Sequence, residues 1–510
     1  LRLATDWLQS GPWELPVDWP AGLELRCLSD VKWAVRSPVA ASGPESGASA
    51  VAASDWQVMV QAEVQEGYVN DPRLPYPCTD IKATVAMDST GIQVKQFSGR
   101  CGTSKLTGEF KGSGWESSAW RMSAQLKDLA LNDQLASKLP ATWKKDYQRF
   151  SPQGHVDLDL TLQSAAGKVH TNLKVQCQNT SFVCGKFPYP LEQGRGLVQW
   201  ADGILVIDSF QARAHGQLVR IDGRIVDPEK FSSGWIEVST AGPIPLDAPL
   251  LEALNTRTRE AIVALQPTGM VTLHRARFER AAEESSALQQ QIDLELHDCS
   301  IKPAKFPYPI DRIRGRIIGD GRVWKFQEMI GRSGGAYVQG TGSWQQGTSS
   351  KGTLVLNLTA TDVPLDNTLR EAIGQLNPKT GRVWESLQPQ GTLDRLTIQL
   401  RSPGADGKPE IAIQGQKWPR RVYAPDPGLL VKPQWFPYRI DHVTGMFNYR
   451  NGQVALTGIR GQHGKSVIRL DGSCFFPMEG PWDAKLTNLT VDHLLADHEF
   501  MTALPPPIRK

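Results

Sequence analysis

Short stretches of alternating apolar and polar residues recur along this chain of 510 residues. Residues 155–162 read HVDLDLTL, and the same period of two occurs in QIDLELHD at 291–298 and in TLVLNLTA at 353–360. Such alternation predicts strands with one face turned away from water and the other exposed to it. The apolar positions of these three predicted strands are Val156, Leu158, Leu160, Leu162, Ile292, Leu294, Leu296, Leu354, Leu356 and Leu358.

A motif built around a tyrosine recurs at intervals of 113 to 130 residues. Its copies are KFPYPLEQGRG at 186–196, KFPYPIDRIRG at 305–315 and WFPYRIDHVTG at 435–445, with a weaker copy, RLPYPCTDIKA, at 73–83. The tyrosines are Tyr76, Tyr189, Tyr308 and Tyr438, and the glycines that follow the last three by seven residues are Gly196, Gly315 and Gly445. Recurrence at such a period indicates a repeated structural unit rather than a catalytic site. We expect the prolines to stiffen the entry to a strand and the tyrosine to pack at a corner.

Each copy is followed by a hairpin signal and then by the start of a helix. Asp-Gly or Asn-Gly pairs supply the positive φ angles of tight hairpins, as at 202–203, 320–321 and 451–452. Asn132, Asp247, Asp366 and Asp492 are candidate N-caps of short helices. Three of these helices lead to a Pro and a Gly, which end a helix and turn the chain into the next strand.

The repeats divide the chain into five segments. They are a partial unit at 1–72 with a loop insertion at 37–55, units at 73–153, 154–268 and 269–390, and a truncated unit at 391–510. We predict an all-β fold with short helices, in which antiparallel meanders form a long, curved, groove-like sheet. Tandem β-sandwiches are the alternative, because an apolar face can also be covered by a second sheet.

Composition excludes several classes of protein. Lys and Arg (56) nearly balance Asp and Glu (53), which gives a net charge of +3 and no basic footprint for nucleic acid. We find no run of about 18 apolar residues that would predict a membrane helix and no signal peptide. Because the sequence begins with Leu1, we expect it to be part of a longer protein, with a membrane anchor outside it.

The seven cysteines contain no CxxC pair, so a zinc site of the usual spacing is not expected. A tight turn at 89–90 would place Cys78 opposite Cys101, and a turn at 180–181 would place Cys177 opposite Cys184, within reach of a disulfide. Buried free thiols are the alternative. Disulfides would indicate an oxidising compartment.

Motifs that suggest catalysis do not fit their context. GRSGG at 331–335 matches G-x-S-x-G, but it aligns with segments between two strands in the other units, so Ser333 is interpreted as a turn residue. GQHGKS at 461–466 has Ile459 where a phosphate-binding loop requires glycine. We therefore expect that the chain is not an enzyme and that it has no cofactor and no metal site.

Three features of the sequence point to a known family: the tight meanders, the motif tyrosines and glycines, and the helix starts of the form PLD…L…AL. On these features the chain from about Tyr76 to Leu495 resembles the AsmA-like and TamB-like envelope proteins with repeating β-grooves. That resemblance implies a non-enzymatic segment that carries phospholipid or another acyl lipid along an apolar groove. It also implies a location in the cell envelope, in the periplasm, and a role in outer-membrane biogenesis. The apolar sets named above would then form the lipid-contacting face. The alternative is a structural or adhesion protein of stacked β-sandwiches that binds protein or glycan through loops such as 37–55.

Overall fold

The chain folds into two compact units, one formed by residues 1–239 with 277–288 and the other by residues 240–276 with 289–510. The computed structural model describes residues 2–4, 24–36, 57–71, 74–88, 90–113, 119–139, 141–165, 168–185, 187–228, 230, 232–282, 286–304, 306–347, 352–376, 378–402, 410–419, 428–450, 452–475 and 483–504. The loop insertion predicted at 37–55 lies outside these residues, and so does Asn451, the first residue of the hairpin signal predicted at 451–452.

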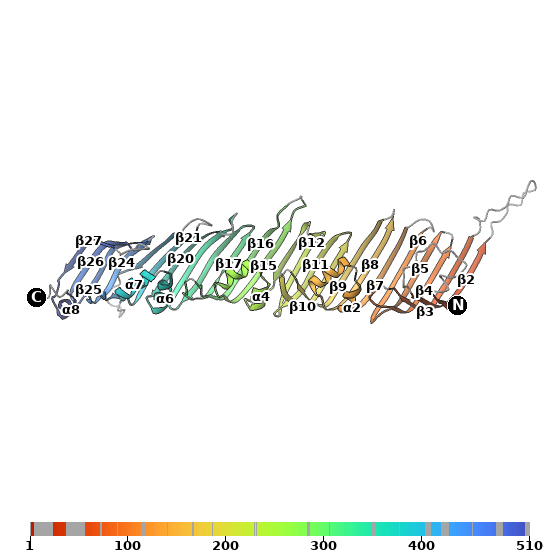
Figure 1. The fold of residues 1–510 in the computed structure, drawn as a ribbon, viewed down its shortest axis with the longest axis horizontal. Coiled ribbons are helices and arrows are strands. Elements are labelled where there is room, and N and C mark those ends of the chain that lie inside the picture. Colours follow the sequence, from red (N-terminus) through yellow and green to blue (C-terminus); the bar gives the residue numbers. More distant parts are fainter. Residues whose placement is uncertain are drawn as a thin grey trace, which may run out of the picture. The chain divides into compact units, whose positions relative to one another are not determined.

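Unit 1 is a run of strands interrupted by one pair of helices (Figure 1). Its strands are β1 (Arg2–Ala4), β2 (Glu24–Arg36), β3 (Gln57–Asn70), β4 (Cys78–Asp88), β5 (Gly91–Cys101), β6 (Ser104–Ser113), β7 (Ala119–Leu131), β8 (Gly154–Ala165), β9 (Lys168–Cys184), β10 (Phe187–Ala201), β11 (Ile204–Ala214) and β12 (Gln217–Val226). Its helices are α2 (Asp133–Lys138) and α3 (Ala141–Phe150). Strands β13 (Ser233–Thr240) and β15 (Thr268–Arg280) are each divided between the two units.

Unit 2 repeats the same succession of strands and short helices. Its strands are β14 (Ile244–Pro245), β16 (Gln289–Ile301), β17 (Ile310–Asp320), β18 (Val323–Ser333), β19 (Ala336–Gln345), β20 (Thr353–Pro364), β21 (Thr392–Ser402), β22 (Glu410–Lys417), β23 (Leu429–Val431), β24 (Ile440–Arg450), β25 (Gln453–His463), β26 (Ser466–Phe475) and β27 (Asp483–Asp492). Its helices are α4 (Ala248–Ala253), α5 (Thr256–Val263), α6 (Asn367–Leu376), α7 (Pro378–Leu387) and α8 (His498–Ala503).

Within each unit the sheet is an antiparallel meander in which successive strands pair. In unit 1 the pairing runs without a break from β1 to β12. In unit 2 it runs from β16 to β22 and on from β24 to β27. Neither sheet closes on itself. The predicted all-β fold of repeated antiparallel meanders is confirmed, and tandem sandwiches are not what the described residues form. The five segment boundaries stay a prediction.

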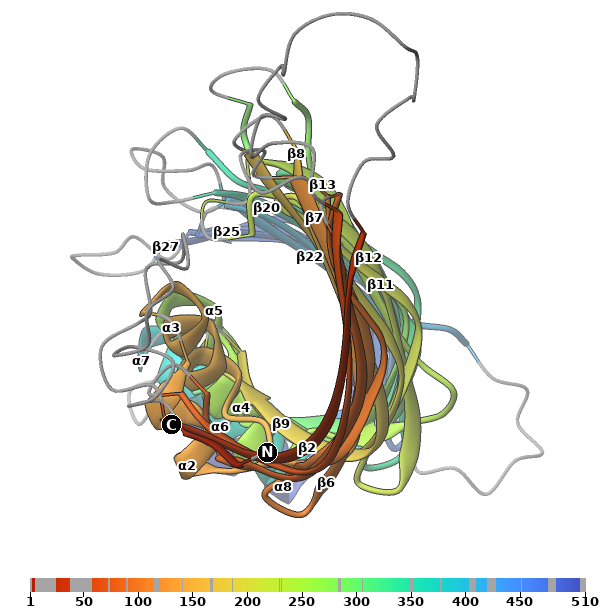
Figure 2. The same ribbon diagram turned by 90° about the vertical axis from the view of Figure 1, so that its right-hand side faces the viewer.

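The strands of each unit curve strongly, and the helices of that unit lie toward the concave side (Figure 2). Bulges recur where the strands bend. In β7 the register shifts between Leu126 and Leu129, and Asp128 between them has a φ of 61°. Comparable shifts occur at Ser209 in β11 and at Glu328 in β18. A bulge adds one residue to one strand and bends it, so a recurring bulge makes the sheet curve.

Aspartates on neighbouring strands stabilise three of these bulges. The extra residue of a bulge leaves its backbone N–H outside the ladder. Asp157 accepts the N–H of Asp128 at 2.9 Å, and Asp222 accepts the N–H of Ser209 at 2.7 Å. In unit 2, Asp471 accepts the N–H of Gly458 at 2.7 Å. An alternating aspartate in these strands therefore has a structural partner as well as contact with water.

The hydrophobic core of each unit lies where the helices meet the sheet. In unit 1, Leu129 of β7, Leu135 of α2 and Val156 of β8 are the buried centre of a cluster to which Tyr147 of α3 adds its ring. In unit 2, Val363, Leu369 and Leu393 are the centre of a larger cluster. Helices α2, α3, α6 and α7 thus cover the apolar face at one end of the strands.

The repeated tyrosine packs against the turn of the next hairpin, which confirms that it forms a corner. The Tyr189 hydroxyl lies 2.9 Å from Nδ1 of His215, and Tyr189 is only 5% exposed. The rings of Tyr438 and His463 are 4.0 Å apart. Tyr308 has Ser333 as a partner, but burial outweighs that hydrogen bond and raises the pKa of Tyr308. Ser333 ends β18 and is 3% exposed, as expected of a turn residue rather than a nucleophile.

Three of the four predicted N-caps are found. Asn132 and Asp247 cap α2 and α4, and the carboxylate of Asp366 accepts the N–H of Leu369 at the start of α6. The prediction for Asp492 is wrong, because β27 continues to that residue. The cap of α8 is Asp497, whose carboxylate accepts the N–H of Phe500. The leucines that closely follow Asp492 in the sequence suggested a helix start there, five residues before the observed cap.

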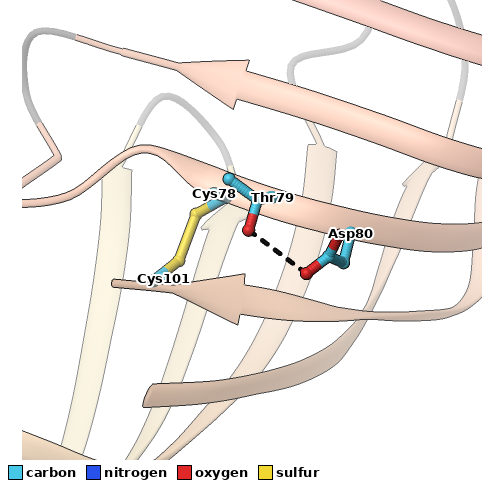
Figure 3. Close-up of a disulfide and its surroundings, with 4 residues drawn as sticks. All are labelled: Cys78, Thr79, Asp80 and Cys101. Carbon is cyan, nitrogen blue, oxygen red and sulfur yellow. Dashed lines mark hydrogen bonds between the residues drawn. A yellow bond between two sulfur atoms is a disulfide. The ribbon is translucent and has the colours of Figure 1, made fainter. Parts of the chain in front are cut away.

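One of the two predicted disulfides forms (Figure 3). Cys78 and Cys101 are directly opposed in β4 and β5, with their Cα atoms 4.3 Å apart, and they are bonded. The prediction for Cys177 and Cys184 is wrong, because β9 runs straight through the turn expected at 180–181. Cys177 instead pairs with Val156 and Gly196, Cys184 pairs with Phe187, and both thiols are free.

The disulfide predicts a measurable contribution to stability. A bond that closes a loop across a sequence separation of 23 residues is expected to stabilise unit 1 by about 3 kcal/mol, through the entropy of the unfolded chain. Replacing both cysteines by serine should lower the free energy of unfolding by that amount, measured by denaturant titration. The matched control is Cys177→Ser with Cys184→Ser, which breaks no bond. Peptide mapping without reductant that found Cys78 and Cys101 unlinked would contradict the assignment.

Candidate functional site

The apolar side chains of unit 1 lie in register across strand after strand. One row joins seven strands through directly paired residues, each apolar and each on the same face. Its members are Val31, Ala62, Val85, Val94, Phe110, Met122 and Leu162. We call this face the apolar floor. It is the face that α2 and α3 cover at one end, because Val156 and Leu158 of β8 belong to both the floor and the helix cluster.

Unit 2 has an apolar floor built in the same way. Its clearest row pairs Leu294, Ile317, Phe326, Gly342, Leu356, Leu400 and Ile411 across seven strands. The period of two along each strand is thus matched by a register that keeps apolar residues opposite one another. A slip by one residue in any pair would send that strand's apolar side chains to the other face.

The ten residues predicted from the alternation all lie on these floors. Those of β8 belong to unit 1, and those of β16 and β20 belong to unit 2. Val156 is 1% exposed beneath the helices, whereas the other nine are only half-buried. No further layer of strands covers them among the described residues. Contact of these ten with lipid stays a prediction.

Large side chains of the floor lie flat over glycines of the neighbouring strand. A Cβ placed on Gly108 of β6 would collide with the Phe97 ring of β5, and a Cβ on Gly415 would collide with the Phe447 ring. On Gly319 it would come within 2.9 Å of the Trp324 ring. In sandwiches the inward side chains stand up and interdigitate with a second sheet. Here they lie along the sheet, so the floor is smooth.

The repeated glycines have the same role. A Cβ on Gly315 would come within 2.5 Å of the Met329 sulfur, and one on Gly196 would come within 2.7 Å of the Phe210 backbone. Gly315 also has a φ of 151°, in a region that a side chain rarely adopts. The glycine seven residues after each tyrosine therefore leaves room for a large residue beside the bend of the sheet.

The opposite face is polar. In unit 1 a depression of about 600 Å³ on that face is lined mainly by polar side chains, among them Glu109, Ser123, Gln125, Asp159 and Lys174. In unit 2 Arg316 forms two hydrogen bonds with Asp293, which lower the pKa of that carboxyl despite partial burial. This cross-strand ion pair and the polar lining of the depression suit a face in contact with water.

Sequence analysis missed part of each floor. Phe110 and Met122 are central in unit 1, but glycines interrupt the alternation around them. The buried pair formed by Lys417 and Asp394 was also missed; Nζ lies 3.0 Å from Oδ1, and both side chains are 4% exposed. Asp394 also accepts the Trp418 N–H at 2.7 Å. Glycines that lie opposite bulky residues of the neighbouring strand are the signal that would have identified the floor strands of Phe110 and Met122.

The part of the chain that the structure describes shows neither a metal centre nor a helix that could span a membrane. No group of three or more His, Cys, Asp or Glu side chains there could hold a metal ion. None of the described helices has the length and apolar character that crossing a bilayer requires. Among the described residues, packing within the protein does not fully explain the apolar floor.

Comparison with known proteins adds no relative. No protein-family model matches the chain, no curated protein does, and neither does any solved structure.

The smooth floor predicts that, of two alanine substitutions in one strand, one lowers stability and the other does not. Gly108→Ala would force the Phe97 ring away from the sheet and crowd the Ser123 carbonyl, so we expect a loss of about 1–3 kcal/mol in unfolding free energy. Gly112→Ala is the matched control, because its Cβ would meet only ordinary contacts of 3.4 Å or more. Equal stability of the two variants in thermal or denaturant unfolding would contradict the flat packing.

The cap of α8 predicts a dependence on pH. Burial disfavours the charged form of His463, but the hydrogen bonds that its ring donates to the Arg439 carbonyl and to the Asp497 carboxylate, 2.9 Å away, outweigh burial and raise its pKa above 6.5. The pKa of Asp497 is lowered from 3.8, chiefly by the Phe500 N–H. The His463 contribution is present below pH 6.5 and is lost as the pH rises through the raised value. The Asp497 contribution is present above pH 3.8 and is lost as the pH falls through the lowered value.

Protection of the α8 amides should therefore be greatest between about pH 4 and 6.5. Hydrogen exchange, corrected for the intrinsic rate, should show a several-fold loss of α8 protection from pH 5.5 to 8.5. The His463→Gln variant should show no such step. A step of the same size in that variant would disprove the assignment to His463.

Proposed function

We propose that this chain is a non-enzymatic lipid-binding segment that carries phospholipid, or another lipid with acyl chains, on its apolar floors. The observation that carries the proposal is the floor itself: apolar residues in register across many strands, half-buried, on the concave side of a bent sheet. The resemblance to AsmA-like and TamB-like proteins points in the same direction, as an interpretation of the sequence motifs.

Energetics supports an occupant with a large apolar surface. Burying a leucine or isoleucine side chain completely is worth about 1.5–3 kcal/mol. Nine predicted floor residues keep only part of their surface in water, so their full burial would together gain on the order of 5 kcal/mol. A concave apolar surface of this kind marks a binding site in a soluble protein, and an acyl layer is an occupant that needs no hydrogen bonds from the floor.

The smoothness of the floor favours acyl chains over a second sheet. A protein layer would gain affinity from side chains that interdigitate, whereas rings lying over glycines offer few projections. Acyl chains adapt to a flat surface and can slide along it, because all their contacts are weak and non-directional. No step of bond making or breaking is needed for this function.

The disulfide is consistent with the cell envelope as the location. A disulfide between Cys78 and Cys101 persists in oxidising compartments such as the periplasm. We propose that the segment works there, next to a membrane to which a further part of the protein anchors it.

Charged substitutions on the floor test the function directly. Leu158→Asp in unit 1 or Leu356→Asp in unit 2 places a carboxylate among acyl chains, so we expect at least a tenfold loss of bound phospholipid carrying a fluorescent acyl chain. Thr161→Asp and Thr359→Asp are matched controls in the same strands on the opposite face. Circular dichroism would show that all four variants fold. Unaltered lipid binding in both leucine variants would refute the proposal.

A further inference from the structure

Tryptophans lie at one end of the floor, at or near the last residue of a strand. In unit 1, Trp120 is the second residue of β7 and Trp200 the penultimate residue of β10. Trp120 alternates with Met122 on the floor and stacks on Phe110 with ring centroids 6.3 Å apart. Trp200 pairs with Leu173 and Leu205. Both tryptophans are half-buried.

Unit 2 repeats this placement with a pair. Trp324 is the second residue of β18 and Trp344 the penultimate residue of β19, and the two are directly opposed. Tyr449 is the penultimate residue of β24 and continues the floor that Phe447 begins. We call these five residues, Trp120, Trp200, Trp324, Trp344 and Tyr449, the aromatic rim.

Polar hairpins begin immediately beyond the aromatic rim. After Trp200 the chain turns at Asp202, whose carboxylate lies 3.0 Å from Nδ1 of His170 and accepts the N–H of Thr171. In unit 2, Asp320 is the residue that opposes Val323, next to Trp324. At Trp200 and at Trp324 the surface thus changes from apolar to aromatic to charged within a few residues.

The other end of the floor is sealed by the helices. In unit 1, Leu129 and Val156 are 3% and 1% exposed beneath α2 and α3. In unit 2, Val363 is 1% exposed and Ala372 of α6 is 0% exposed. A polar group would find no water beneath these helices, so the strands that they cover have one polar border and one closed border.

Indole and phenol rings prefer the boundary between acyl chains and polar headgroups, because one part of the ring is apolar and the other can hydrogen-bond. The strand between Trp120 and Leu129 spans nine residue steps, or about 30 Å of extended chain. One acyl layer of a bilayer is about 15 Å thick. The floor is therefore long enough for an acyl chain that starts at the aromatic rim and runs toward the helices.

We propose that each bound lipid is oriented, with its headgroup beyond the aromatic rim and its acyl chains lying along the strands toward the helices. This inference rests on the proposed lipid-binding function and adds which border of the floor the headgroup crosses. The rim residues would then set the depth of the lipid, while the closed helix end excludes headgroups from the floor.

Photocrosslinking of the full chain with two phosphatidylcholine probes tests the orientation. One probe carries a diazirine in the headgroup and the other carries it at the end of an acyl chain, and adducts are mapped by mass spectrometry. The headgroup probe should label residues within two positions of Trp120, Trp200 and Trp344. The acyl-chain probe should label the floor near the helices, at Leu126, Leu158 and Leu396.

Two controls separate orientation from non-specific labelling. Trp235 lies on the polar face, because it alternates with Ile236 beside floor residue Gly223, and Arg277 covers its ring at 4.5 Å. It should acquire no adduct from the acyl-chain probe. In a variant with Trp324→Leu and Trp344→Leu, headgroup adducts at the ends of β18 and β19 should fall at least threefold, while those of unit 1 remain.

The outcomes distinguish this inference from the proposed function. Floor adducts with the reverse order of the two probes, or with the same sites for both, would overturn the orientation and leave lipid binding standing. An absence of floor adducts from both probes would overturn lipid binding itself, and the orientation with it.

Discussion

The structure depends on one constraint: an antiparallel sheet with an apolar face has to remove that face from water, and here the described residues cover it only at one end. The helices of each unit seal the ends of the strands around Val156 in unit 1 and Val363 in unit 2. The remaining floor is bent but not enclosed by the described residues. Bulges bend this surface and glycines keep it smooth.

Bending and smoothness come from small features that repeat. Bulges at Asp128 and Ser209 curve the strands, and aspartates on neighbouring strands accept the backbone N–H groups that the bulges release. Glycines let aromatic rings lie on the adjacent strand instead of standing above it. The motif tyrosine fixes the next hairpin turn at the corner, as Tyr189 does with His215. Together these features give a surface that is shaped by the backbone rather than by projecting side chains.

The sequence predicted the fold class because alternation and repetition report directly on burial. The strand at 154–165 and its floor residues could be identified from period two alone, and the caps Asn132 and Asp247 from their side-chain chemistry. Other features depend on the partner strand, which local sequence does not specify. Cys177 and Cys184 looked like a hairpin pair, but no turn interrupts β9. Phe110 was not found because its neighbours Gly108 and Gly112 hide the alternation, although they are what make its strand part of the floor. The depth of burial of Lys417 and Asp394 likewise arises only when β21 and β22 pair.

The central claim is that acyl chains, not protein, cover the apolar floors. Native mass spectrometry of the full chain, purified from cells without added lipid, measures this most directly. We expect a series of masses above that of the protein alone, with increments that fragment into phospholipids with intact acyl chains. A single mass equal to the bare chain, from a sample whose floor amides are already protected against hydrogen exchange, would contradict the account.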